Sequence, residues 1–198
     1  MYGFTSKILR TSFLGLIVAS GIGAMPATSA VAQAEPAGWV GGLFGLSIPN
    51  YDNTSSRLMY GITGGAKVGT ELGLGAYYLT SSKDEDATVA GGSKQPFNYD
   101  MFGIEFAYHF EGEAKGVYVG GRLGTSKIKA GSPVSYTTSP VHYGAVGGYN
   151  KFLGENFSLG GEFNFMSVPE SDVDVNGTSQ KIKAFSMLNF LFSAKLWF

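Results

Sequence analysis

The feature that most constrains the fold is a strict alternation at the end of the chain, between Ile182 and Phe198. From Leu188 to Phe198 every second residue is apolar, whereas the intervening residues are mixed and include Lys195. A period of two residues is typical of a β-strand with two different faces. About 9–11 residues of tilted strand cross a bilayer, and this stretch is longer, so we predict a membrane-spanning strand. Its apolar positions are Leu188, Phe190, Phe192, Ala194, Leu196 and Phe198.

Seven earlier stretches show the same alternation, with apolar side chains on one face and small or polar side chains on the other. The apolar faces carry almost no charge. A lysine or arginine at mid-bilayer on a lipid-facing strand would cost about 2–4 kcal/mol, which gives this absence a physical cause. The stretches are residues 38–48, 57–67, 71–80, 97–110, 117–124, 141–149 and 157–165.

The connections between these stretches alternate between long and short. Residues 49–53, 81–96, 129–140 and 169–180 form the longer, polar connections, and only short turns separate the other pairs. Outer-membrane barrels have this asymmetry, because their external loops are long and their periplasmic turns are tight. The sequence therefore predicts an all-β fold, an eight-stranded antiparallel up-and-down transmembrane β-barrel.

Residues 1–34 have the pattern of a cleaved signal peptide. Lys7 and Arg10 supply the basic start, residues 12–24 carry no charge, and Ala32-Gln33-Ala34 fits a cleavage site. We therefore predict a signal peptide at 1–34 and a barrel at 35–198. The chain has no cysteine, and its 30 glycines suit crowded, curved strands.

Two soluble folds compete with this interpretation. A β-sandwich would also have short strands separated by polar turns. A barrel of lipocalin type would need an apolar inside and a polar outside, the inverse of the arrangement that we predict. The formal net charge of −1 gives no indication of nucleic-acid binding.

The closing stretch resembles the last strand of Gram-negative outer-membrane barrels. Over essentially all of residues 35–198, the chain is similar to the OmpA transmembrane domain and to OmpX, so we expect it in the bacterial outer membrane. The resemblance implies contact with outer-membrane lipid and lipopolysaccharide, and with the barrel-assembly machinery. It implies no peptidoglycan-binding domain, because the chain stops at the barrel. The machinery would read Phe198, Leu196, Phe192 and Phe190 as its assembly signal.

The inward-facing positions contain three acids and three bases. An eight-stranded barrel has an interior just wide enough for side chains to fill, so opposite charges there can pair and block the lumen. We expect a polar, salt-bridged interior; a narrow, gated pore is the alternative. The predicted interior network consists of Lys67, Glu71, Glu105, Arg122, Glu162 and Lys195.

We assign no catalytic, cofactor or metal residues from the sequence. His142 is followed by Tyr143 and Gly144 rather than by a nearby serine, so it lacks the pattern of a lipid A deacylase, and we interpret it as an isolated inward or rim histidine. Residues 172–177 match the first half of a calcium loop, but Lys183 stands where a bidentate glutamate is required. Asn176-Gly177 is better explained as a tight hairpin turn.

The function that we expect is therefore a structural or surface-interaction role in the outer membrane, with polar loops that can reach an extracellular or host ligand. A narrow channel for small solutes and a lipid-modifying enzyme are the alternatives.

Overall fold

The computed structural model describes residues 37–50, 54–83, 97–130, 136–175 and 178–198. Its one helical element in these ranges is the three-residue 3₁₀ turn η1, Gly112–Ala114. Within the same ranges, no helix is long and apolar enough to cross a membrane. The strands are β1 Gly38–Asn50, β2 Arg57–Val68, β3 Leu72–Ser81, β4 Phe97–His109, β5 Val117–Ala130, β6 Tyr136–Thr138, β7 Val141–Phe152, β8 Phe157–Val168, β9 Ser171–Val175, β10 Thr178–Ile182 and β11 Phe185–Trp197.

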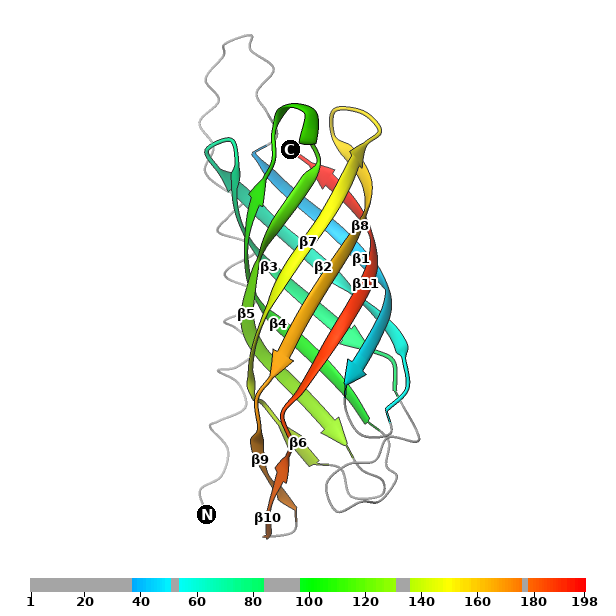
Figure 1. Ribbon diagram of the computed structural model, residues 1–198, viewed down its shortest axis with the longest axis vertical. Helices are drawn as coiled ribbons and strands as arrows, with labels where there is room; N and C mark the ends of the chain where they lie inside the picture. Colours follow the sequence, from blue (N-terminus) through cyan, green and yellow to red (C-terminus); the bar gives the residue numbers. More distant parts are fainter. Residues whose placement is uncertain (1–36, 51–53, 84–96, 131–135, 176–177) are drawn as a thin grey trace, which may run out of the picture. The chain divides into compact units, whose positions relative to one another are not determined.

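Eight long strands close into a barrel (Figure 1). They are β1, β2, β3, β4, β5, β7, β8 and β11, and each pairs antiparallel with the next. The ring is completed by β1 and β11, whose pairing runs from Trp39–Trp197 to Asn50–Ser186. The predicted all-β, eight-stranded antiparallel barrel is therefore confirmed.

The two ends of the barrel differ (Figure 1). At one end, which we call the short-turn end, tight connections join β2 to β3, β4 to β5 and β7 to β8. Gly69, Gly112 and Gly116 have positive φ values of 77°, 64° and 100° there, a conformation that glycine adopts without steric cost. The opposite, long-loop end carries β6 and the hairpin of β9 and β10.

The long-loop end contains more strand than the sequence predicted. We expected loops at 129–140 and 169–180, the second with a hairpin turn at Asn176-Gly177; β6 pairs with the end of β5, and β9 and β10, on either side of the predicted turn, pair as a hairpin. The prediction was wrong there because short polar segments carry no alternation in hydrophobicity, although their backbone groups can still pair. The predicted Asn176-Gly177 turn lies outside the described residues.

The outer wall of the barrel is apolar, as the alternation predicted. Leu196 is 56% exposed and Phe106 54% exposed, yet both lie in regular strands. Phe163 on β8 and Phe190 on β11 face each other across paired strands, with ring centroids 5.2 Å apart. A soluble lipocalin-type barrel would have the opposite distribution, so this rival is excluded.

Glycines let neighbouring strands approach closely around the curved wall. A Cβ atom built on Gly120 of β5 would lie 1.9 Å from the carbonyl oxygen of Phe106 on β4. On the outer face of β8, a Cβ atom on Gly161 would meet no heavy atom within 4 Å. Only the first position therefore requires glycine for steric reasons.

We expect Gly120→Ala to lower the folded fraction of the barrel strongly, because its methyl group would overlap backbone that cannot move aside. Heat-modifiable mobility on a gel, together with the urea midpoint in detergent, measures the effect. Gly161→Ala is the matched control and should fold like the wild type. Equal behaviour of the two variants would contradict the steric requirement at Gly120.

Candidate functional site

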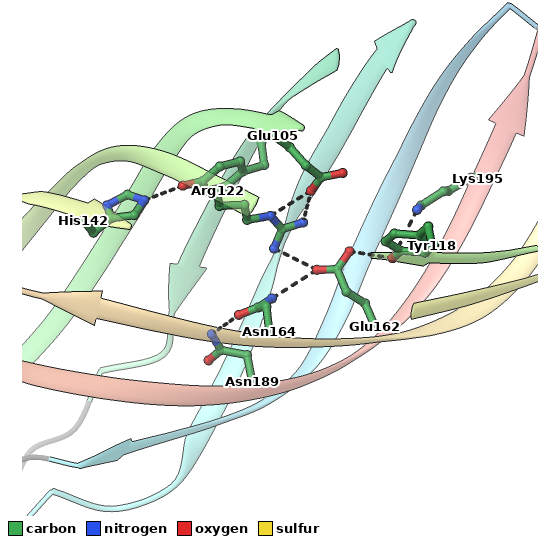
Figure 2. A network of polar contacts seen from close by, with 9 residues as sticks. Glu105, Tyr118, Arg122, His142, Glu162, Asn164, Asn189 and Lys195 are labelled. Atoms are coloured by element: carbon green, nitrogen blue, oxygen red, sulfur yellow. Dashed lines mark hydrogen bonds and ion pairs between the residues drawn. The ribbon is translucent and has the colours of Figure 1, made fainter. Parts of the chain in front are cut away.

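The centre of the barrel interior is a buried ion cluster around Arg122 (Figure 2). Arg122 on β5 stands directly opposite Glu105 on β4, and its Nε and Nη2 atoms lie 2.8 and 2.5 Å from Glu105 Oε2. Its Nη1 lies 2.8 Å from Oε1 of Glu162 on β8. These side chains are at most 3% exposed. One guanidinium thus bridges two carboxylates from different parts of the wall.

The local sequence explains how β5 and β8 can meet although β7 lies between them. Gly144 of β7 is the register partner of Arg122, and Gly148 is the partner of Glu162. A Cβ atom on Gly148 would lie 2.6 Å from the hydroxyl oxygen of Tyr118, so this glycine leaves room for the β5 side chain to cross β7 and reach Glu162 on β8. A Cβ atom on Gly144 would instead lie 2.7 Å from the sulfur of Met166.

Polar side chains extend the cluster in two directions (Figure 2). Tyr118 donates a hydrogen bond of 2.9 Å to Glu162 Oε2, and Lys195 Nζ lies 3.4 Å from the Tyr118 hydroxyl and 4.4 Å from its ring centre. Asn164 donates to Glu162 Oε1 at 3.1 Å and accepts from Asn189 at 2.5 Å. The buried cluster therefore contains balanced charges, with two carboxylates, one guanidinium and one ammonium.

The structure brings together only part of the predicted network. Glu105, Arg122, Glu162 and Lys195 are buried. Lys67 and Glu71 instead lie near the short-turn end at the close of β2 and the start of β3, where they are half-buried. The Glu71 backbone carbonyl accepts a hydrogen bond of 2.7 Å from the backbone N–H of His109.

His142 is not the isolated histidine that the sequence suggested. It is fully buried, its Nδ1 lies 2.8 Å from Ser126 Oγ, and its Nε2 is hydrogen bonded to the Tyr77 hydroxyl. Arg122 in turn lies over the ring of Tyr77, with Cζ 4.6 Å from the centroid. His142 therefore belongs to the side-chain network, and the serine that it contacts comes from a neighbouring strand rather than from the adjacent sequence.

Near the long-loop end the buried side chains are mostly apolar, although Ser47, Arg57 and Ser81 are buried there as well. Met59, Met101, Met166 and Met187 are each at most 1% exposed, and they are all the methionines in residues 35–198. Methionine is unbranched and fills irregular space well. We call the cluster the apolar plug; its members are Leu43, Met59, Tyr77, Leu79, Tyr99, Met101, Ile128, Met166, Val168, Ile182, Phe185, Met187 and Leu191.

Aromatic rings close the interior at the short-turn end. His109 stacks on Tyr118 at 5.6 Å and meets the edges of Trp39 and Trp197 at 5.7 and 6.1 Å. The two indoles lie 5.9 Å apart. Trp197 Nε1 also donates to Ser158 Oγ at 2.8 Å. We call His109, Tyr118, Trp39 and Trp197 the aromatic seal; the sequence analysis missed it, although all four occupy inward positions.

The arrangement offers little for a metal ion or for catalysis. Among the described residues, no group of three or more His, Cys, Asp or Glu side chains could hold a metal. Part of the calcium-like segment 172–177 lies outside the described residues. The contacts of His142 are to hydroxyl groups, and Ser126 is 1% exposed, so a substrate has no access to this serine.

The wall and interior together define a class of protein: a closed antiparallel barrel that is apolar outside and has buried polar and charged side chains inside, which is the architecture of small outer-membrane barrels. A family model described as outer membrane protein beta-barrel domain matches residues 14–184, and the chain belongs to this family. A comparison with curated protein sequences found no match.

Solved structures include barrels of similar shape. Neisserial surface protein A is 13% identical, with a TM-score of 0.65, over 81% of this chain and 97% of that one. Ail, the attachment invasion locus protein of Yersinia pestis, is 12% identical, with a TM-score of 0.54, over 83% of this chain and 99% of that one. At these identities the similarity shows the fold alone.

The protein is therefore located in the bacterial outer membrane, as the resemblance implied. In such barrels the short turns face the periplasm and the long loops face the exterior. This assigns the aromatic seal to the periplasmic end and the apolar plug to the extracellular end.

We expect Arg122→Ala to destabilise the barrel by about 3–5 kcal/mol, because it leaves two buried carboxylates without their shared cation. Urea unfolding in lipid vesicles measures this loss. The triple variant Glu105→Gln, Arg122→Met, Glu162→Gln removes all three charges and should lose much less. If Arg122→Ala unfolds at the wild-type urea concentration, the cluster contributes nothing to stability.

Proposed function

We propose that the protein is a non-conducting outer-membrane scaffold that displays its extracellular loops for surface interactions. The observation that carries this proposal is the filling of the interior along the barrel axis. The aromatic seal, the ion cluster and the apolar plug occupy the periplasmic, central and extracellular parts of the lumen in turn.

The apolar plug argues most directly against ion passage. A permeating ion loses its hydration shell in a narrow pore and needs polar groups to replace it, whereas hydrophobic constrictions act as gates by excluding water. Met59, Leu79 and Met101 are fully buried and offer no such groups. A narrow channel, the alternative from the sequence, would require both the plug and the Arg122 cluster to rearrange.

The extracellular end provides ordered structure on which binding can be built. The hairpin of β9 and β10 has an exposed ion pair between Lys181 Nζ and Glu170 Oε1 at 2.5 Å. Thr138 of β6 donates a hydrogen bond of 3.2 Å to the backbone carbonyl of Asp172 on β9, which connects two separate loops. Loops held on a rigid scaffold commonly carry binding functions.

The similar structures favour a surface-interaction role over a purely structural role. Ail is an attachment invasion locus protein, and one of its structures contains the heparin analogue sucrose octasulfate. We propose a related type of role here, with an extracellular or host ligand that contacts the loops. We propose no enzymatic activity, since the buried Ser126–His142 pair is inaccessible to a substrate.

We also propose that the closing strand serves as the signal for the barrel-assembly machinery. Phe190, Phe192, Leu196 and Phe198 point outward and are 52–59% exposed, so a membrane-embedded partner can contact all four. The strand pairs with β8 on one side and with β1 on the other, where the ring closes.

In planar bilayers we expect the purified barrel to show no discrete channel openings, because bulky buried side chains occupy both ends and the centre of the interior. Single-channel recording measures this, and gel mobility of the recovered sample verifies that the barrel is folded. Regular, reproducible openings of the wild type at moderate voltage would contradict the scaffold proposal and favour a pore.

Deleting residues 172–181 should leave the barrel folded but reduce surface binding severalfold. The deletion keeps Ile182 of the apolar plug, joins it to Ser171 and leaves a six-residue connection between Val168 and Phe185, which are register partners. Adhesion of bacteria that produce each form to cultured epithelial cells, and retention of each purified form on immobilised heparin, measure the effect. Unchanged values in both assays would contradict a binding role for this hairpin.

A further inference from the structure

The outward face of β5 changes from apolar to positively charged near its extracellular end. Side chains of a strand alternate between two faces, so the outward positions after Val119 and Leu123 are Thr125, Lys127 and Lys129. Val119 and Leu123 are 48% and 49% exposed apolar residues in the lipid-facing band. Two lysines therefore follow this band on the same outward face, at alternate positions about 7 Å apart along the strand.

The register between β4 and β5 shows where these lysines lie relative to the apolar band. Phe102 of β4, the last apolar residue on its outward face, pairs with Thr125, and the next outward residue, Asp100, pairs with Lys127. Lys127 thus lies one outward position beyond the apolar band. Tyrosines are enriched where a bilayer meets water, and three half-exposed ones lie near this level on the outer wall. They are Tyr60, Tyr78 and Tyr143.

Asp100 holds Lys129 against the wall. The carboxylate accepts hydrogen bonds from Thr80 Oγ1 at 2.7 Å and from Lys129 Nζ at 2.8 Å. The side chain of Asp100 is 14% exposed, whereas that of Lys129 is 42% exposed. An ammonium group has three donor hydrogens, so Lys129 keeps donors for a ligand in addition to Asp100. Lys127, Lys129 and Asp100 together have a net positive charge.

The opposite side of the barrel has a different surface at the same extracellular end. There, Asn50, Ser186 and Ser167 are register partners on β1, β11 and β8. They line a hollow of about 310 Å³ together with Phe165, Ala184 and Phe185, and no lysine or arginine contributes to it. Lys183 directly precedes Ala184 of this lining and is exposed, so lysines also occur on this side, but the two lysines at alternate outward positions just beyond the apolar band are on β5.

We propose that Lys127 and Lys129 form a binding site for phosphate groups on lipid headgroups of the outer leaflet. The site lies immediately beyond the lipid-facing band, where headgroups begin. Lysine binds phosphate as a mobile point charge, which suits a headgroup that approaches from the side. This site is separate from the loop-mediated binding proposed above, and each can fail without the other.

The test uses full-length barrel in nanodiscs of phosphatidylcholine that contain either diphosphorylated lipid A or its dephosphorylated form. Native mass spectrometry measures how much of each lipid stays bound. We expect the wild type to retain the phosphorylated form preferentially, and Lys127→Gln/Lys129→Gln to bind it about tenfold more weakly. Both lysines are on the surface, so the variant should fold normally.

Lys115→Gln/Lys151→Gln is the matched control. It removes the same charge from the periplasmic end, where both side chains are exposed, and should leave binding unchanged. The proposal is overturned if the extracellular double variant keeps wild-type binding, if the control loses as much, or if dephosphorylated lipid binds equally well. Equal competition by inorganic phosphate, at matched phosphate concentration, would overturn the assignment to a lipid headgroup.

Discussion

Closure of the hydrogen-bonded ring is the constraint on which the rest of this structure depends. In lipid, a backbone N–H or C=O without a partner costs several kcal/mol, so an open sheet edge is not tolerated. The pairing of β1 with β11 removes both edges. Once the ring is closed, each side chain must face either lipid or a narrow interior, and the alternation of apolar and small or polar residues follows from this choice.

The side chains of the barrel interior pack in two different ways along the barrel axis. In the centre, Arg122 neutralises Glu105 and Glu162. Nearer the exterior, methionines and branched aliphatic side chains fill the space. A buried ion cluster specifies its partners by charge and geometry, whereas methionine adapts to the space that remains. Charged and apolar side chains thus lie in different parts of the same interior.

The outer wall was predictable from sequence because its signal is local. Phe102, Ile104 and Phe106 alternate within one strand, and this pattern needs no knowledge of the neighbouring strands. The contacts of the interior were not predictable, since they depend on register between strands far apart in the chain. Arg122 and Glu162 were identified as inward charges, but their contact across β7 was not. The methionines were also visible in sequence, and only the three-dimensional structure shows that they converge.

The placement of the indoles has a spectroscopic consequence. Trp39 and Trp197 are the only tryptophans of the chain, and both lie in the aromatic seal, directly opposite each other on the two strands that close the ring. Their ultraviolet emission therefore reports on a single zone, the periplasmic end of the β1–β11 seam. A refolding experiment followed by this emission would record when the first and last strands pair. It would not detect ordering of the distant loops.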